Sequence, residues 1–374
     1  MSARNLALLS AILASSMAFI DGTALNVALP RIQEALSLSG VEMLWVVNGY
    51  TLFLASLMLA GGALGDVLGK KKVFQWGIVI FSFASAGCGL AQDGLMLIIL
   101  RMAQGVGGAL MVPGSLALIT AVFPREERGR AIGTWSMFSA FTTILGPVLG
   151  GYLADIGLWR MVFFINVPLG VVALGLLSKV EEPVQQSDRQ LDWRGALLAT
   201  LGTSSAVFAF LQAGERGFRE PLIAITLLCG LLLLLLFLWW ESRTADPMLP
   251  LSLFQSPTFS AANFLTLLVY GALGAALFFL PLNLIQVQGY NASMAGLAIL
   301  PFGGLIALLA RLSGSWTDRV GPKWPLTIGP AITGMAFFSF SLIGQTSGPE
   351  AFWTSFFPVL VLAGIGMGLT VVPL

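Results

Sequence analysis

Charged side chains are scarce in this chain of 374 residues: only 10% of the residues are Asp, Glu, Lys or Arg, whereas 57% are hydrophobic. Charged residues make up about 25% of an ordinary soluble domain, so much of this chain is too apolar to face water. The formal net charge of +1 offers no clustered basic surface of the kind that binds phosphates. The composition therefore argues against a nucleic-acid partner and indicates a protein embedded in the lipid bilayer.

Histidine is absent, and the two cysteines, Cys88 and Cys229, each lie within a long apolar run. Zinc and haem sites depend on these residue types, so we expect no metal and no cofactor. No nucleophile with a neighbouring base is visible, which argues against an enzyme. Without histidine, any side chain that titrates between pH 5 and 8 has to be a carboxylate in an unusual environment.

The chain contains twelve apolar segments close to the length of about 20 residues that crosses the hydrocarbon core of a bilayer. Their approximate limits are 6–28, 44–65, 73–92, 95–122, 131–153, 161–178, 195–213, 221–240, 259–285, 293–310, 325–345 and 351–374. The first segment carries Asp21 and has no convincing small-residue cleavage site, so we interpret it as an uncleaved spanning helix. These segments predict an all-α, polytopic membrane protein.

Lysine and arginine are concentrated in the loops that fall on the same side of the membrane as the amino terminus. Among them are Lys70, Lys71, Lys72, Arg125 and Arg128. Positive charge accumulates on the cytoplasmic side of membrane proteins. We therefore expect a cytoplasmic amino terminus in the plasma or inner membrane.

Two short patterns recur along the chain. A Gly-x3-Asp-x2-Gly pattern at residues 62–69 returns at 314–321, and a glycine-rich run at 105–109 returns at 364–368. The repetition predicts two pseudo-symmetric halves, as in many transporters. We expect a six-helix half over residues 1–180, two additional helices over 181–250, and the first four helices of a second half over 251–374. The second half then lacks its last two helices, and the chain ends inside the twelfth segment.

The loop after the second segment combines glycine, aspartate and a basic run. Its notable residues are Gly62, Asp66, Gly69 and Lys70, and Asp318 occupies the equivalent position in the second copy. Glycines let two helices approach closely, and an aspartate beside basic residues stabilises a loop through charge and helix dipoles. We expect a structural or gating role for these residues.

Asp21 is the one carboxylate that falls well inside a predicted span. A charge at that depth is costly unless it is protonated, paired or hydrated, and a carboxylate that alternates between such states can carry a proton. Arg101 lies in the fourth segment, and both residues fall about 10 Å below the outer boundary at 1.5 Å per residue. We expect the arginine to favour the ionised aspartate when the two meet. A hydrated aspartate and an arginine that snorkels to the surface are the alternatives.

The fifth segment contains Gly146, Pro147 and Gly150. Proline removes a backbone donor and bends a helix, whereas the glycines allow close packing on a neighbour. We expect a kinked, closely packed helix, with or without a role in coupling.

Together, the motifs at residues 21–30, 62–72, 101–109 and 146–151 resemble the Major Facilitator Superfamily, in its fourteen-helix drug:proton antiporter branch. The resemblance implies transport by alternating access, with Asp21 and Arg101 in proton coupling and the loop at 62–72 at the cytoplasmic gate. The family pattern has a further glycine at the position of Thr142, so the match to an antiporter is weaker there.

The resemblance favours proton-coupled efflux of small hydrophobic or cationic compounds, because the spans contain few charges. We expect flexible, aromatic and amide side chains to line the substrate chamber: Asn26, Trp45, Asn48, Met111, Met137, Phe138 and Asn283. The alternatives are a proton symporter of a metabolite and a scaffold that does not transport. Whether a periplasmic adaptor takes part is beyond the sequence.

Overall fold

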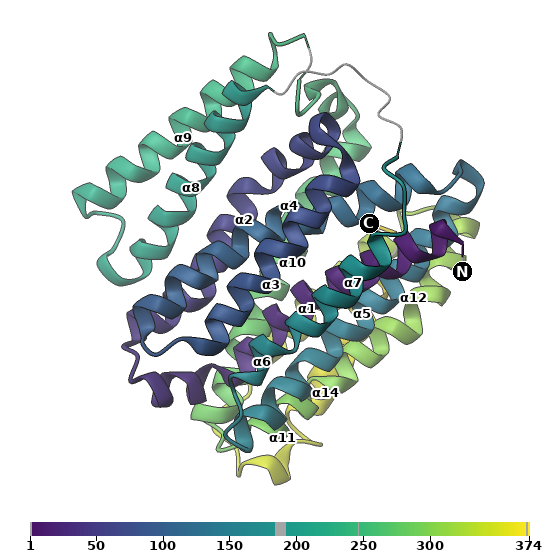
Figure 1. Cartoon of the computed structure of the whole chain (residues 1–374). Helices are drawn as coiled ribbons and strands as arrows, with labels where there is room; N and C mark the ends of the chain where they lie inside the picture. The colour runs from purple at the N-terminus through teal and green to yellow at the C-terminus, as the bar shows by residue number, and fades with distance from the viewer. Residues whose placement is uncertain (1, 184–191, 246, 372) are drawn as a thin grey trace. The chain divides into compact units, whose positions relative to one another are not determined.

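The computed structural model describes residues 2–183, 192–245, 247–371 and 373–374. The side chains at 140, 144, 215, 310, 311, 315, 318 and 319 lie outside this description. Within the described residues the chain is helical apart from loops and two short 3-10 turns, and no strand occurs there (Figure 1). The predicted all-α membrane fold is confirmed.

Every predicted segment corresponds to a helix or to a pair of consecutive helices. The helices are α1 Ala3–Leu36, α2 Gly40–Leu68, α3 Lys70–Leu90, α4 Gly94–Val122, α5 Arg125–Asp155, α6 Met161–Phe164, α7 Asn166–Leu177, α8 Trp193–Arg216, α9 Pro221–Glu241, α10 Pro257–Gln286, α11 Ala292–Ala298, α12 Leu300–Val320, α13 Pro325–Phe340 and α14 Phe356–Thr370. Among the described residues, nine helical stretches are long and apolar enough to cross a membrane. Three further apolar stretches, 161–177, 325–340 and 356–370, are shorter.

The described chain divides into two compact units that do not follow the order of the sequence. The first unit contains residues 1–18, 36–135 and 163–255, and the second contains 19–35, 136–162 and 256–374. Helices α1 and α5 therefore each contribute to both units. The division into sequence halves stays a prediction.

Small residues set the packing of the first unit, in which α4 lies against both α2 and α3 (Figure 1). A Cβ atom at Gly61 of α2 would collide with the carbonyl oxygen of Ala109, and a Cβ at Gly107 of α4 would crowd the backbone of Phe81 in α3. Side-chain-free positions thus let the backbones approach closely, as in other membrane helix pairs. Around them, Phe74, Phe81 and other apolar residues form a buried core.

The helices α8 and α9 pair with each other, and α8 also packs on α2 (Figure 1). Asp192 accepts hydrogen bonds from the backbone N–H of Gly195 at 3.0 Å and from the indole of Trp240 at 2.8 Å. This aspartate therefore both caps α8 and connects it to the end of α9.

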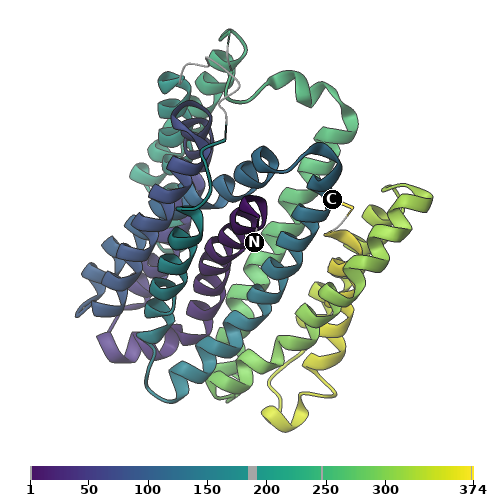
Figure 2. The same cartoon turned by 45° about the vertical axis from the view of Figure 1, so that its right-hand side comes forward.

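The second unit contains the pair α13 and α14, which run side by side (Figure 2). Here too glycine permits the contact, because a Cβ at Gly329 would clash with Thr370. Phe302, Leu360 and Met367 belong to the buried core of this unit. The twelfth segment, like the fourth, also packs through glycines, because a Cβ at Gly364 would crowd Phe302 and one at Gly366 would crowd Thr333.

Candidate functional site

The loop between α2 and α3 depends on an acidic residue far away in the sequence. Glu182 accepts hydrogen bonds from the backbone N–H groups of Lys71 at 2.9 Å and Lys72 at 3.2 Å. Gly69 has φ of +104°, and a Cβ there would lie 2.9 Å from the Glu182 carboxylate. Both the backbone conformation and the available space therefore favour glycine at this position.

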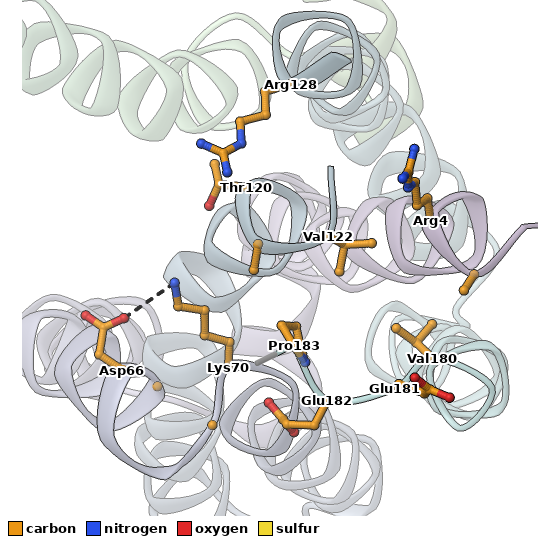
Figure 3. Close-up of a pocket in the computed structure, with 14 residues that line it drawn as sticks. Arg4, Asp66, Lys70, Thr120, Val122, Arg128, Val180, Glu181, Glu182 and Pro183 are labelled. Carbon is orange, nitrogen blue, oxygen red and sulfur yellow. Dashed lines mark ion pairs between the residues drawn. The ribbon is translucent and has the colours of Figure 1, made fainter. Parts of the chain in front are cut away.

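Beside this loop lies a polar cavity of about 680 Å³, which we call the proximal cavity because Ala3 and Arg4 line it. Figure 3 shows Lys70, Arg4 and Arg128 around it, together with the carboxylates of Asp66, Glu181 and Glu182. Lys70 pairs with Asp66 at 3.6 Å (Figure 3). A Cβ at Gly62 would meet nothing within 4 Å. The predicted loop motif thus borders a cavity lined by charges of both signs.

Arg101 is 1% exposed on α4, and its guanidinium makes several contacts within the first unit. Its Nε donates to the carbonyl oxygen of Val46 at 3.1 Å, and a terminal nitrogen donates to Gln104 Oε1 at 2.7 Å. The guanidinium also lies 4.3 Å from the ring centroid of Tyr50. These partners fix the position of the positive charge inside the helix bundle of this unit.

Asp21 is fully buried on α1, with 0% of its surface exposed. It belongs to the second unit, whereas Arg101 belongs to the first. Their approach to each other therefore stays a prediction. The next residue, Gly22, borders open space, since a Cβ there would meet nothing within 4 Å.

The glycine motif of α5 packs closely on two other helices. Toward α1, a Cβ at Gly146 would collide with Thr23, and a Cβ at Gly150 would collide with the backbone of Ala24. Toward α11, Gly151 lies against the carbonyl group of Ala292, and Gly296 of α11 lies against the carbonyl group of Pro147. We call this packing the distal contact; its residues are Thr23, Ala24, Gly146, Pro147, Gly150, Gly151, Ala292 and Gly296.

Asp155, the last residue of α5, adds a charged interaction to the distal contact. Its two carboxylate oxygens accept hydrogen bonds from the backbone N–H groups of Ala292 at 3.1 Å and Ser293 at 2.9 Å. A carboxylate at these donors is favoured by hydrogen bonding and by the helix dipole. Sequence reasoning missed Asp155 and Glu182, because a carboxylate that caps a helix more than 100 residues away leaves no local pattern.

The residues predicted to line a substrate chamber are distributed over both units. Trp45 and Asn48 lie together beside α8, where the Trp45 ring is 5.9 Å from that of Phe208. Met111 is buried in the core of the first unit, whereas Met137 and Phe138 are exposed on α5.

Two asparagines of the predicted substrate chamber, Asn283 and Asn26, lie in the second unit in positions that suit ligand binding. Asn283 lines an apolar cavity of about 500 Å³ between α10 and the α13–α14 pair. The side-chain oxygen of Asn26 is buried and has no hydrogen-bond partner in the described part of the chain. The side chain of Asp318 lies outside the described residues.

The fold defines a multi-pass helical membrane protein, and a family model sharpens this assignment. The model described as Major Facilitator Superfamily matches residues 11–374. The chain belongs to the Major Facilitator Superfamily.

Similar proteins agree with this assignment. The chain is 34% identical over 315 residues to the Multidrug resistance protein Stp of Mycobacterium tuberculosis, covering 84% of this chain and 59% of that protein. It is 36% identical over 302 residues to the Methylenomycin A resistance protein of Bacillus subtilis, covering 79% and 65% respectively. The chain thus spans less than two thirds of the length of both relatives.

A crystal structure of a POT family transporter in complex with a thioalcohol conjugated peptide has the same fold. It superposes with a TM-score of 0.73 at 13% identity and covers 98% of this chain and 82% of that one. At this identity the similarity concerns the fold alone.

Proposed function

We propose that this chain acts in proton-coupled export of small hydrophobic or cationic compounds by alternating access. The same proposal assigns it to the fourteen-helix drug:proton antiporter branch, which its motifs resemble, and to the cell membrane with a cytoplasmic amino terminus. Relatives named for resistance to multiple drugs and to methylenomycin A support the class of substrate.

The burial of Asp21 is the observation that carries the proposal. The residue is fully buried in a helix long and apolar enough to cross a membrane. Acidic side chains inside membrane-spanning segments are rare and usually functional. A chain without histidine has few other groups that could exchange a proton near neutral pH.

Arg101 supplies the second part of the proposed coupling. Contacts with the Val46 carbonyl, Gln104 and the Tyr50 ring hold its buried positive charge in place within the first unit. An approaching cation favours the ionised form of an acid, and its withdrawal favours the protonated form. Proton release and uptake by Asp21 would follow the distance between the two residues.

The environment of Asn26, which lies on the same helix as Asp21, supports a role of this residue in substrate binding. It lies five residues after Asp21 on α1, and its buried side-chain oxygen has no protein partner among the described residues. A buried acceptor without a partner costs free energy, which a ligand donor or an ordered water would recover. The unpartnered oxygen therefore supports the predicted membership of Asn26 in the substrate site.

Replacing Asp21 by asparagine tests the coupling, because the change keeps the shape and removes the titration. In proteoliposomes, Asp21→Asn should abolish pH-gradient-driven movement of a fluorescent hydrophobic cation while retaining its binding. Asp93→Asn is the matched control, because Asp93 is an exposed cap of α4 that accepts from the N–H of Met96. Gradient-driven transport at the wild-type rate in Asp21→Asn would overturn the proposal.

Symport of a metabolite is the second candidate, because Thr142 replaces a glycine of the antiporter pattern. The two directions are separated by reversing the pH gradient in the same assay. An antiporter concentrates the cation on the acidic side of the membrane, whereas a symporter concentrates substrate on the alkaline side. A scaffold moves no substrate in either direction.

A further inference from the structure

We propose that Asp155 is a positioning residue of the transport cycle. Its two hydrogen bonds to the start of α11 hold α5 and α11 together at the distal contact, and they break when these two helices move apart. The inference rests on alternating access, but not on proton coupling or on the identity of the substrate. Neither the predicted motifs nor the family resemblance includes this residue.

The first step of the argument is that α11 does not need Asp155 in order to form. Asn291 already caps this helix, because its side-chain oxygen accepts from the N–H of Met294 at 2.7 Å. The N–H groups of Ala292 and Ser293 are the other two unsatisfied donors of the first turn, and water would satisfy them if the carboxylate were absent. Asp155 therefore contributes chiefly by connecting two helices rather than by creating one.

The second step concerns which helices are connected. In the predicted division α5 belongs to the first half and α11 to the second, so a bond between them restrains the movement of one half against the other. Residues 19–35 and 136–162 form one compact unit with residues 256–374. The distal parts of α1 and α5 are therefore already packed with the second half in this structure, which is the arrangement expected of a closed end.

The third step is that the bond is suited to break. Between α5 and α11 the distal contact brings backbone against backbone at Gly151 and Gly296, and such surfaces separate without rearranging side chains. Asp155 lies at the exposed edge of this contact, where water can replace both of its hydrogen bonds. An exposed carboxylate cap is a modest restraint, so it can bias the closed state without locking it.

A distance measurement between two spin labels tests this role in the full chain. We would attach the labels at Leu158→Cys, just after α5, and Met294→Cys on α11, because both native side chains are exposed. The exposed Cys229 is replaced by serine, and the buried Cys88 is kept. Pulsed electron spin resonance then gives the populations with short and long separations.

We expect Asp155→Ala to raise the ratio of long to short separations about threefold to tenfold, the range that corresponds to loss of one helix cap. Asp155→Asn keeps an acceptor but loses the charge, so its ratio should lie between those of the wild type and the alanine variant. Asn291→Ala is the matched control: it weakens the same helix start and should lower the melting temperature without changing the ratio.

The proposal is overturned if Asp155→Ala leaves the ratio unchanged, or if Asn291→Ala raises it equally, because the residue would then be an ordinary cap. Far-UV circular dichroism and a single elution peak establish that each variant is folded. The readout is independent of transport, so a failure of the Asp21→Asn experiment leaves this result standing, and the reverse also holds.

Discussion

Two carboxylates cap distant helices in this protein, and the difference between them separates a structural bond from a switchable one. Glu182 accepts from Lys71 and Lys72 at the start of α3, whereas Asp155 accepts from Ala292 and Ser293 at the start of α11. The chemistry is the same in both places. The two helix starts differ in whether the N-cap residue itself has a side chain that accepts a hydrogen bond.

At α3 the remote carboxylate replaces a missing local cap. The residue at the N-cap is Gly69, which has no side chain to accept a hydrogen bond, so Glu182 is the side-chain acceptor for this helix start. At α11 a local cap is present in Asn291, and Asp155 is additional. We conclude that removing Glu182 should damage a helix, whereas removing Asp155 should loosen a connection between helices.

The variant with the largest expected effect on this comparison is one that obstructs the distal contact between α5 and α11. In Gly151→Ala the new Cβ would collide with the backbone of Ala292 in α11, which cannot move aside as a side chain can. We expect the closed distal end to lose about 1–3 kcal/mol, the usual cost of overpacking. The spin-label ratio should rise more than in Asp155→Ala.

Gly175→Ala is the control for that variant, because a Cβ at Gly175 would meet nothing within 4 Å. A wild-type ratio in Gly151→Ala would mean that the close packing of α5 on α11 does not hold this end closed.

A smaller effect is expected from Gly69→Ala in the loop between α2 and α3. The φ of +104° is unfavourable for alanine, and the Cβ would also crowd Glu182. Strain of this kind costs about 1–3 kcal/mol, part of which the exposed glutamate can relieve by moving. We expect a lower melting temperature and faster hydrogen exchange at the amides of Lys71 and Lys72, with no change in the spin-label ratio.

The control for this variant is Gly62→Ala, whose new Cβ would face open space. Equal exchange rates in Gly69→Ala and the wild type would contradict the proposed role of the loop conformation.

The smallest effect should follow from Glu182→Gln, which keeps one acceptor and removes the charge. Loss of a charge at a helix start costs about 0.3–1 kcal/mol at low ionic strength. The melting temperature should fall slightly in low salt and approach the wild-type value in high salt, because salt screens the charge. A decrease of equal size at both salt concentrations would show that the hydrogen-bond geometry, and not the charge, stabilises α3.

The spanning helices were predictable, because an apolar run of about 20 residues has few alternatives in a bilayer. Their ends were less predictable: α1 extends from Ala3 to Leu36, well beyond the predicted segment 6–28, since polar residues continue the helix outside the apolar run. The tenth segment is divided between α11 and α12, with Pro301 in the first turn of α12. Proline suits the first turn of a helix, because the N–H that it lacks would have no partner within the helix there.

The candidate site was predictable only in part. Asp21 and Arg101 stand out in the sequence because charge inside an apolar segment is conspicuous, and both are buried. Nothing in the sequence indicated that Trp45 and Asn48 lie beside α8, because packing partners depend on how the helices assemble. Whether these two residues contact a substrate stays a prediction.

The sequence by itself determined that this is a multi-pass helical membrane protein with one deeply placed acid, since hydropathy and the cost of burying charge depend on local composition. Only the tertiary structure decided which glycines meet which backbones, and that Asp155 and Glu182 cap helices far from them in the chain. The physical reason is that backbone donors are present at the start of every helix, so no residue type at that start reveals which remote carboxylate will bind there.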